Sequence, residues 1–201
     1  VSLLLNTAPF MIYFGEEVGE RGMDEEGFSG RDGRTTIFDY WSVDTIRRWR
    51  DGGTFSGREL NDGERDLQRQ YARLLHLARE ERAISEGDFF DLMYANPYSD
   101  RFNFHRMYAF LRKHDDELLL IVANFDEHAT EVDVHIPIHA FDYFHLPTLE
   151  SVEAVELLTG TTTTLSLTPD APVRLTVPGY SGGVWKVRQP LAAVNRTEGA
   201  G

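Results

Sequence analysis

Hydrophobic and polar residues alternate along most of the second half of the chain. After Gly87 the apolar positions recur about every two residues, and turn sequences such as HDD (114–116) and TPDAP (168–172) interrupt the pattern. This pattern predicts eight strands, at 88–93, 106–113, 117–125, 129–136, 152–158, 163–167, 173–178 and 182–188. Many short strands at such spacing are typical of an antiparallel sandwich, for which we expect Greek-key connections.

The first half of the chain shows two other patterns. Residues 9–14 form a short continuous apolar run, which is typical of a strand covered on both faces. Further on, a stripe of apolar residues with spacings of three and four predicts a helix, made by Leu67, Tyr71, Leu74, Leu75 and Ala78. Asn61 and Glu64 are placed to form a capping box at its start.

The segment between these elements, residues 15–63, contains ten glycines and many charges. Loops of this length in compact domains are usually functional or disordered, and six aromatic residues argue against simple disorder here. Within the segment, residues 41–52 could form a short helix. Val43, Ile46 and Trp49 would then share one face, where packing is the expected role.

The chain thus consists of two unlike parts. Residues 1–86 give one strand, a long loop and one helix, whereas residues 87–188 are all β, and the patternless tail 189–201 is expected to be disordered. A single buried strand needs neighbours on both sides for its backbone hydrogen bonds. We therefore expect the first part to be the end of something larger, and expect residues 9–14 to expose apolar area without it.

The composition of the chain excludes some kinds of chemistry and disfavours some partners. The chain has 201 residues, no cysteine and a net charge of −13, so thiol chemistry is excluded, and nucleic acid and anionic membranes are poor partners. A neutral partner such as a sugar is not disfavoured. No apolar stretch is long enough for a transmembrane helix, and no basic region opens a signal peptide, so the compartment stays open.

Three segments in order carry a family resemblance, namely PFMIYFGEEVG, GRTTIFDYW and LQRQYARLLHLARE. They resemble the eighth barrel strand, the following βα loop and the last barrel helix of the alpha-amylase family, glycoside hydrolase family 13. The segments GDFFDLM, MYAFLRKHDDELLLIVANF and VELLTG resemble that family's C-terminal all-β domain. The resemblance implies the end of a (β/α)8 barrel followed by an antiparallel β-sandwich, in an alpha-glucan hydrolase acting on starch, glycogen or maltodextrin.

The resemblance also says what this chain lacks. In the family, the nucleophile, the general acid and a third carboxylate lie on barrel strands four, five and seven, whereas this chain resembles only the part from strand eight onward. We therefore expect no catalytic residue and no hydrolase activity in this chain, and we expect the upstream barrel of the same protein as its partner. The residues alone leave open a non-catalytic carbohydrate-binding or scaffold module.

The resemblance implies that several residues line the rim of the substrate cleft. These candidates are Glu16, Glu17, Arg34, Asp39, Tyr40 and Trp41. Carboxylates that directly follow a barrel strand would lie at the mouth of the barrel. One of the Glu16 and Glu17 carboxylates could point to the sugar while the other pairs with Arg31 or Arg34. Alternatively, both carboxylates could anchor the loop. Arg34 and the aromatic residues could likewise bind sugar or form a satellite hydrophobic cluster.

Histidines and the β domain leave two further questions. His135 and His139 have the spacing of a helical zinc pair, but Pro137 lies between them, so we expect no metal in this chain. Calcium is common in the family, although its usual ligands would come mostly from upstream segments. The β domain could bind glucan through Tyr143, Phe144 and Trp185, or could act as a structural cap.

Overall fold

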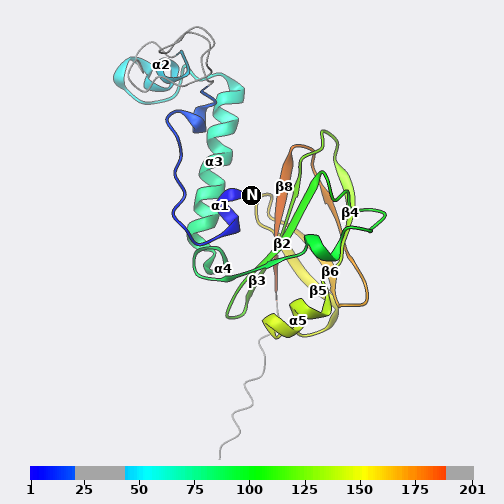
Figure 1. Cartoon of the computed structure of the whole chain (residues 1–201). Helices are drawn as coiled ribbons and strands as arrows, with labels where there is room; N and C mark the ends of the chain where they lie inside the picture. The colour runs from blue at the N-terminus through cyan, green and yellow to red at the C-terminus, as the bar shows by residue number, and fades with distance from the viewer. Residues whose placement is uncertain (21–43, 189–201) are drawn as a thin grey trace, which may run out of the picture. The chain divides into compact units, whose positions relative to one another are not determined.

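The structure is a computed structural model that describes residues 1–20 and 44–188 (Figure 1). The chain divides into two compact units, one made of residues 1–7 with the chain from Leu77 onward, the other of residues 8–76. The sequence predicted a boundary after residue 86. The packing instead groups residues 1–7 and 77–86 with the β domain, because Leu4, Leu77 and Ile84 are buried against its sheet.

Within the described residues, eight strands form two antiparallel sheets. The larger sheet has the order β1-β2-β3-β8-β5-β6, and the smaller pairs β4 with β7. The strands are β1 (Asp88–Asp91), β2 (Met107–His114), β3 (Glu117–Asn124), β4 (Thr130–Val134), β5 (Leu149–Glu156), β6 (Thr161–Leu167), β7 (Val173–Val177) and β8 (Ser181–Val187). Each corresponds to a predicted strand, so the antiparallel all-β part of the prediction is confirmed.

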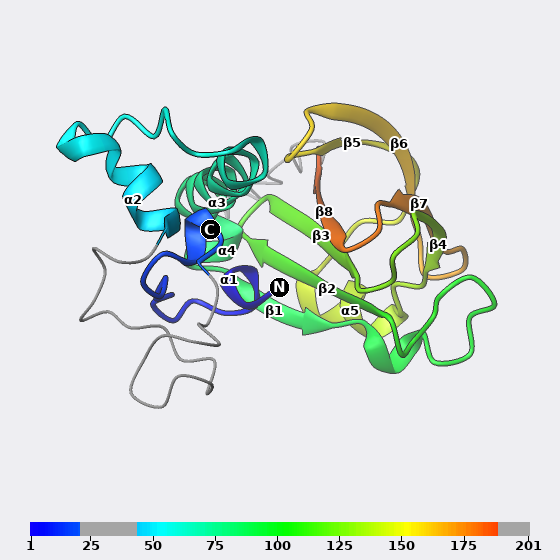
Figure 2. The ribbon, with the colours of Figure 1, turned by 90° about the horizontal axis from the view of Figure 1, so that it is seen from above.

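The central strand β3 is buried on both faces, which explains its nearly continuous apolar sequence. Leu118, Leu120 and Val122 face the main core, which the β4–β7 pair closes on the other side. Leu119 and Ile121 face a second core, which is covered by helix α1 (Ser2–Leu5), the end of α3 and helix α4 (Arg82–Ser85). Figure 2 shows α1 and α4 on one side of β2 and β3, with β4 and β7 on the other.

A short helix in the β domain was not predicted. Helix α5 (Ile138–Phe144) follows Pro137 and ends at His145, which has a φ of 51°. Ala140, Phe141 and Phe144 are buried in the main core, so the helix closes one end of it. Its seven residues are too few to establish a 3.6-residue period from the sequence alone.

Helix α4 is joined to the sheet by a buried arginine. The Arg112 guanidinium on β2 donates to the carbonyls of Ala83 (3.0 Å), Ile84 (2.7 Å) and Leu5 (3.2 Å). Burial lowers the pKa of Arg112 from its ordinary value. These bonds satisfy carbonyls of α1 and α4 that lack partners within such short helices.

An ion cluster lies at the same face of the sheet. The Lys186 ammonium on β8 donates to Glu81 (2.6 Å) and Glu117 (2.5 Å), and Glu117 also accepts the Ala83 N–H (2.5 Å). Burial and the neighbouring Glu117 raise the pKa of Glu81. The cluster therefore joins the start of α4 to two strands.

The second unit, residues 8–76, contains helix α2 (Asp44–Arg50), the single turns η1 (Glu16–Val18) and η2 (Asp51–Gly53), and most of α3 (Asp62–Glu80). The predicted capping box of α3 is present. The Glu64 N–H donates to Asn61 Oδ1 and the Asn61 N–H donates to Glu64 Oε2, both at 2.9 Å. The short helix expected within 41–52 is also present, as α2.

The strand predicted at residues 9–14 is absent. Residues 8–13 have no regular secondary structure, and the side chain of Met11 is 79% exposed. The physical reason is that no described strand lies beside this segment to accept its hydrogen bonds, while its composition remains that of a buried strand. No described helix is long and apolar enough to cross a membrane.

Candidate functional site

Glu16 and Glu17, two of the rim candidates, lie in η1. The preceding residue, Gly15, has a φ of 75°, and a Cβ there would lie 2.7 Å from the Cβ of Glu20. Only glycine fits this left-handed, crowded position. The apolar run therefore ends in a tight turn, in which the Glu16 carboxylate folds back to accept the Tyr13 N–H.

Glu16 makes two hydrogen bonds within its unit. Its Oε1 accepts from the Tyr71 hydroxyl on α3 (2.6 Å), and its Oε2 accepts from the Tyr13 N–H (3.1 Å). The bond from Tyr71, followed by that from Tyr13, holds the pKa of Glu16 below its ordinary value. Burial and the Glu16 carboxylate raise the pKa of Tyr71 to about 12. Glu16 is thus charged and oriented, with both oxygens engaged.

The other rim candidates lie partly within the described residues and partly outside them. Glu17 is half-buried in the same turn as Glu16. Arg34, Asp39, Tyr40 and Trp41 lie outside the described residues, as does Arg31. The rim assignment therefore stays a prediction.

Arg48 connects α2 to the start of α3, a contact that sequence reasoning missed. Its Nε donates to Glu64 Oε2 (3.0 Å), and its Nη2 also pairs with Glu64 Oε1. This bidentate pair holds the pKa of Glu64 below its ordinary value. Glu64 therefore serves the capping box and the contact with α2 together.

A small core lies beneath this polar network. Val18, Ile46 and Leu60 are buried together, and Phe14 and Trp49 pack against them. The Trp49 ring also contacts Phe55, with ring centroids 5.2 Å apart. Packing is thus confirmed for Ile46 and Trp49, whereas Val43 lies outside the described residues.

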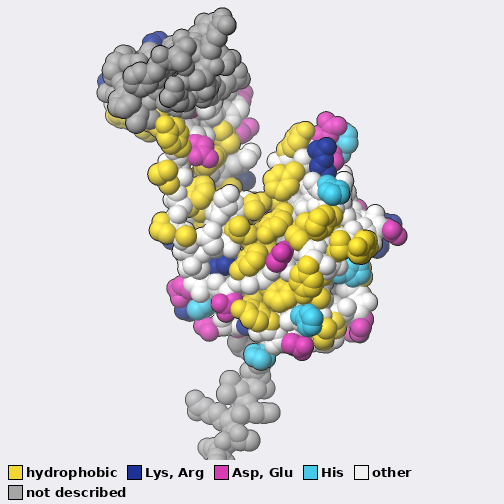
Figure 3. All heavy atoms as spheres, viewed as in Figure 1, with side chains coloured by type: hydrophobic (Ala, Val, Ile, Leu, Met, Phe, Trp, Pro, Cys, Tyr) yellow, Lys and Arg dark blue, Asp and Glu magenta, His cyan; other side chains and the backbone are white. Residues whose placement is uncertain are grey.

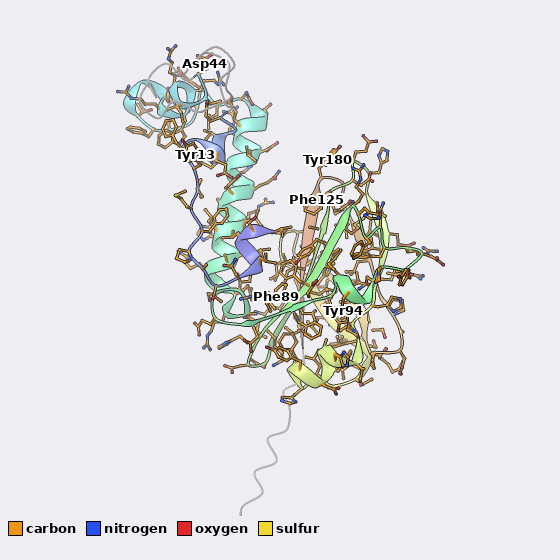
Figure 4. The ribbon with its side chains drawn as sticks, in the orientation of Figure 1. Tyr13, Asp44, Phe89, Tyr94, Phe125 and Tyr180 are labelled. Atoms are coloured by element: carbon orange, nitrogen blue, oxygen red, sulfur yellow. The ribbon has the colours of Figure 1, made fainter. Side chains whose placement is uncertain are left out.

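The β domain carries a second aromatic group, at one end of the main core. Phe90 on β1 lies near Tyr94 on the turn η3 (Met93–Ala95) and near Tyr143 on α5, with ring centroids 6.2 and 5.8 Å apart. Figure 4 labels Tyr94, above α5 in that view. Of the three residues through which the β domain could bind glucan, Tyr143 is exposed, but Phe144 and Trp185 are buried in the core. Sequence reasoning did not bring these aromatic residues together, because helix α5, which carries Tyr143, was not predicted.

Among the described residues, no group of three or more histidine, aspartate or glutamate side chains could hold a metal ion. His135 follows β4, whereas His139 lies within α5 beyond Pro137, so the two do not share a helical face. Calcium binding by a larger protein stays a prediction.

No protein-family model matches the chain, and no curated protein matches it. Similar solved structures include AmyP in complex with maltose, with 18% identity, a TM-score of 0.47, and coverage of 67% of this chain and 23% of that chain. The maltogenic alpha-amylase AmyB from Thermotoga neapolitana has 15% identity, a TM-score of 0.45, and coverage of 64% and 26%. The alpha-amylase from Geobacillus thermoleovorans complexed with acarbose has 20% identity, a TM-score of 0.43, and coverage of 68% and 26%.

Alpha-amylases are thus among the solved structures that this chain resembles. The chain spans about a quarter of the length of these structures.

Proposed function

We propose that this chain is the C-terminal part of an alpha-amylase-type glycoside hydrolase that acts on α-1,4-glucans such as starch, glycogen and maltodextrin. One observation carries the proposal. The motif MYAFLRKHDDELLLIVANF forms the β2–β3 hairpin, in register from Met107 with Asn124 to His114 with Glu117. This hairpin belongs to a two-sheet antiparallel domain that follows the capped helix α3 along the chain, which is the order that the sequence resemblance implies.

The exposure of residues 8–76 supports the view that this unit completes a larger body. Phe10, Met11 and Tyr13 are exposed in the segment expected to be a barrel strand. Leu75, on the predicted apolar stripe of α3, is 37% exposed. Burial of these groups against upstream strands and helices would be favourable at about 25 cal/mol per Å² of apolar area.

In such an enzyme, this chain would supply structure and part of the rim. Retaining hydrolysis needs a nucleophile and a general acid on either side of the scissile bond, with carboxyl groups about 5 Å apart. Glu16 does not suit either role, because both of its oxygens accept hydrogen bonds from Tyr71 and Tyr13. The reacting carboxylates would come from upstream strands, as the resemblance implies.

A non-catalytic carbohydrate-binding module is the second candidate. The exposed rings of Tyr94 and Tyr143 favour it, since aromatic faces pack against the C–H faces of sugars. In that case the β domain would account for the whole function, and residues 8–76 would need no catalytic neighbour.

The decisive assay uses maltoheptaose with two samples, this chain and the product of the whole reading frame that contains it. Proton NMR tracks the anomeric form of the first products. We expect the whole product to release α-anomers, because hydrolysis through a glycosyl-enzyme intermediate retains configuration. We expect no release by this chain alone. Hydrolysis by this chain, or a whole product that cleaves no α-glucan, would contradict the proposal.

A further inference from the structure

Three aromatic side chains from separate elements form a surface that the proposed chemistry does not use. We name it the aromatic platform, and it consists of Phe90, Tyr94 and Tyr143. The side chains of Tyr94 and Tyr143 are 53% and 55% exposed, while Phe90 between them is half-buried. Phe90 packs against the main core, and the Tyr143 ring contacts the ring of the buried Phe144, with ring centroids 4.9 Å apart. The core therefore supports the platform from below.

The platform combines apolar faces with polar groups. Tyr94 and Tyr143 each bring a hydroxyl that donates and accepts hydrogen bonds. Asp91 lies at the end of the same strand as Phe90, and its Oδ1 accepts the Met93 N–H at 2.8 Å. Its Oδ2 can accept a further hydrogen bond. Burial, together with the Asp91 carboxylate, raises the pKa of Tyr94, so its hydroxyl stays protonated and able to donate.

This combination restricts the class of ligand. A net charge of −13 and the adjacent Asp91 disfavour an anion such as nucleic acid or an acidic lipid surface. A purely apolar partner would cover the two tyrosine hydroxyls without offering them hydrogen-bond partners. A neutral ligand with C–H faces and many hydroxyls satisfies both kinds of group. Figure 3 shows the setting, a face of the β domain on which hydrophobic side chains gather with acidic and histidine side chains among them.

The rings of the platform are tilted relative to one another. The Phe90 ring makes interplanar angles of 51° with Tyr94 and 47° with Tyr143. The two exposed rings are therefore not coplanar with the half-buried ring that contacts both of them.

We propose that the aromatic platform Phe90, Tyr94 and Tyr143 is an α-glucan-binding surface on the β domain. The choice of glucan rests on the function proposed above. The surface would hold one part of a long polysaccharide while another part occupies the cleft, which raises the local concentration of substrate.

The test measures maltoheptaose binding to the whole 201-residue chain by titration calorimetry, for the wild type and for Tyr94→Ala with Tyr143→Ala. Each side chain is exposed by more than half, so the variants should fold. We expect the double variant to bind about tenfold or more weakly, because the stacking contacts are lost. Tyr98→Ala is the matched control, since its side chain is 96% exposed, and it should bind as the wild type does.

Four results would overturn the inference. They are no binding by the wild type, equal binding by the double variant, an equal loss in Tyr98→Ala, and equal wild-type affinity for cellohexaose. Self-association that the double variant abolishes, without glucan binding, would instead make the platform a contact between copies and would also overturn it. Failure of the proposed function can be distinguished from failure of this inference. It would appear as an absence of maltoheptaose hydrolysis by the whole product, and that hydrolysis does not require the platform.

Discussion

Glu64 illustrates how one residue can hold several elements together. It is 8% exposed, completes the capping box with Asn61 and pairs with Arg48 on α2. The pairing depresses its pKa, so the folded state favours the carboxylate more than the unfolded state does. This stabilisation is therefore present above the ordinary glutamate pKa of about 4.3 and is lost as the pH falls through the lower folded-state value.

Glu64→Gln keeps an acceptor for the Asn61 N–H but removes the charge that faces Arg48. We expect it to lower the free energy of unfolding by about 1–2 kcal/mol at pH 7, measured by urea denaturation monitored by circular dichroism. The difference from the wild type should shrink below about pH 4. Asp66→Asn is the control, because the Asp66–Arg69 pair is exposed and should matter little. A pH-independent difference would contradict the assigned role of the carboxylate.

Arg112 joins α1 and α4 to strand β2, so its loss should destabilise the β domain. Arg112→Met keeps most of the apolar stem but leaves the carbonyls of Ala83, Ile84 and Leu5 without their donor. Because buried unpaired carbonyls are costly, we expect a loss of about 3 kcal/mol or more in unfolding free energy. Arg106→Met, at an exposed position, should change stability by less than about 0.5 kcal/mol. Similar effects for the two variants would show that the three bonds contribute little.

The junction between α4 and β1 depends on a glycine at a close approach. A Cβ at Gly87 would lie 2.4 Å from the Ala83 carbonyl oxygen and 2.5 Å from that of Lys113. Gly87→Ala should therefore force the backbone apart and lower the unfolding free energy by about 1–3 kcal/mol. Gly63→Ala, where the nearest atom is 3.4 Å from the added carbon, should cause no loss. The stabilities of the two variants and the wild type are compared by thermal unfolding. A Gly87→Ala variant as stable as the wild type would refute this account.

At the scale of elements, the pattern of apolar residues identified the strands of the β domain. Strand β7 alternates buried and exposed residues, whereas β3 is a continuous apolar run that is buried on both faces. Asn61 and Glu64 fixed the start of α3 for a chemical reason, reciprocal capping. Helix α5 was not predicted because it is too short to show a period. The strand predicted at residues 9–14 is absent, because the segment has the composition of a buried strand but no described neighbour to pair with.

The candidate site was less accessible to sequence reasoning. The bond from Tyr71 to Glu16 joins residues 55 positions apart, and no local pattern predicts such a contact. The aromatic platform likewise depends on α5, which brings Tyr143 to within 5.8 Å of Phe90. Buried Trp185 and Phe144 were plausible sugar contacts from sequence because alternation alone does not tell which face of a strand or helix meets the core.

At the scale of the whole molecule, the two units differ in completeness. The β domain has a main core shared by both sheets and a second core on the outer face of the larger sheet. The unit of residues 8–76 has a core of only three buried apolar residues among those described and leaves an apolar segment exposed. This contrast is what we expect if the first is an independent domain and the second completes a barrel.

Hydrogen–deuterium exchange on this chain and on the product of the whole reading frame tests that central claim most directly. Amides of residues 118–123 lie in the middle of the larger sheet and should be protected in both samples. We expect amides of residues 10–14 to exchange rapidly in this chain and to become strongly protected in the whole product, where upstream strands would pair with them. Rapid exchange of residues 10–14 in both samples would contradict the account, because the segment would then not be a barrel strand.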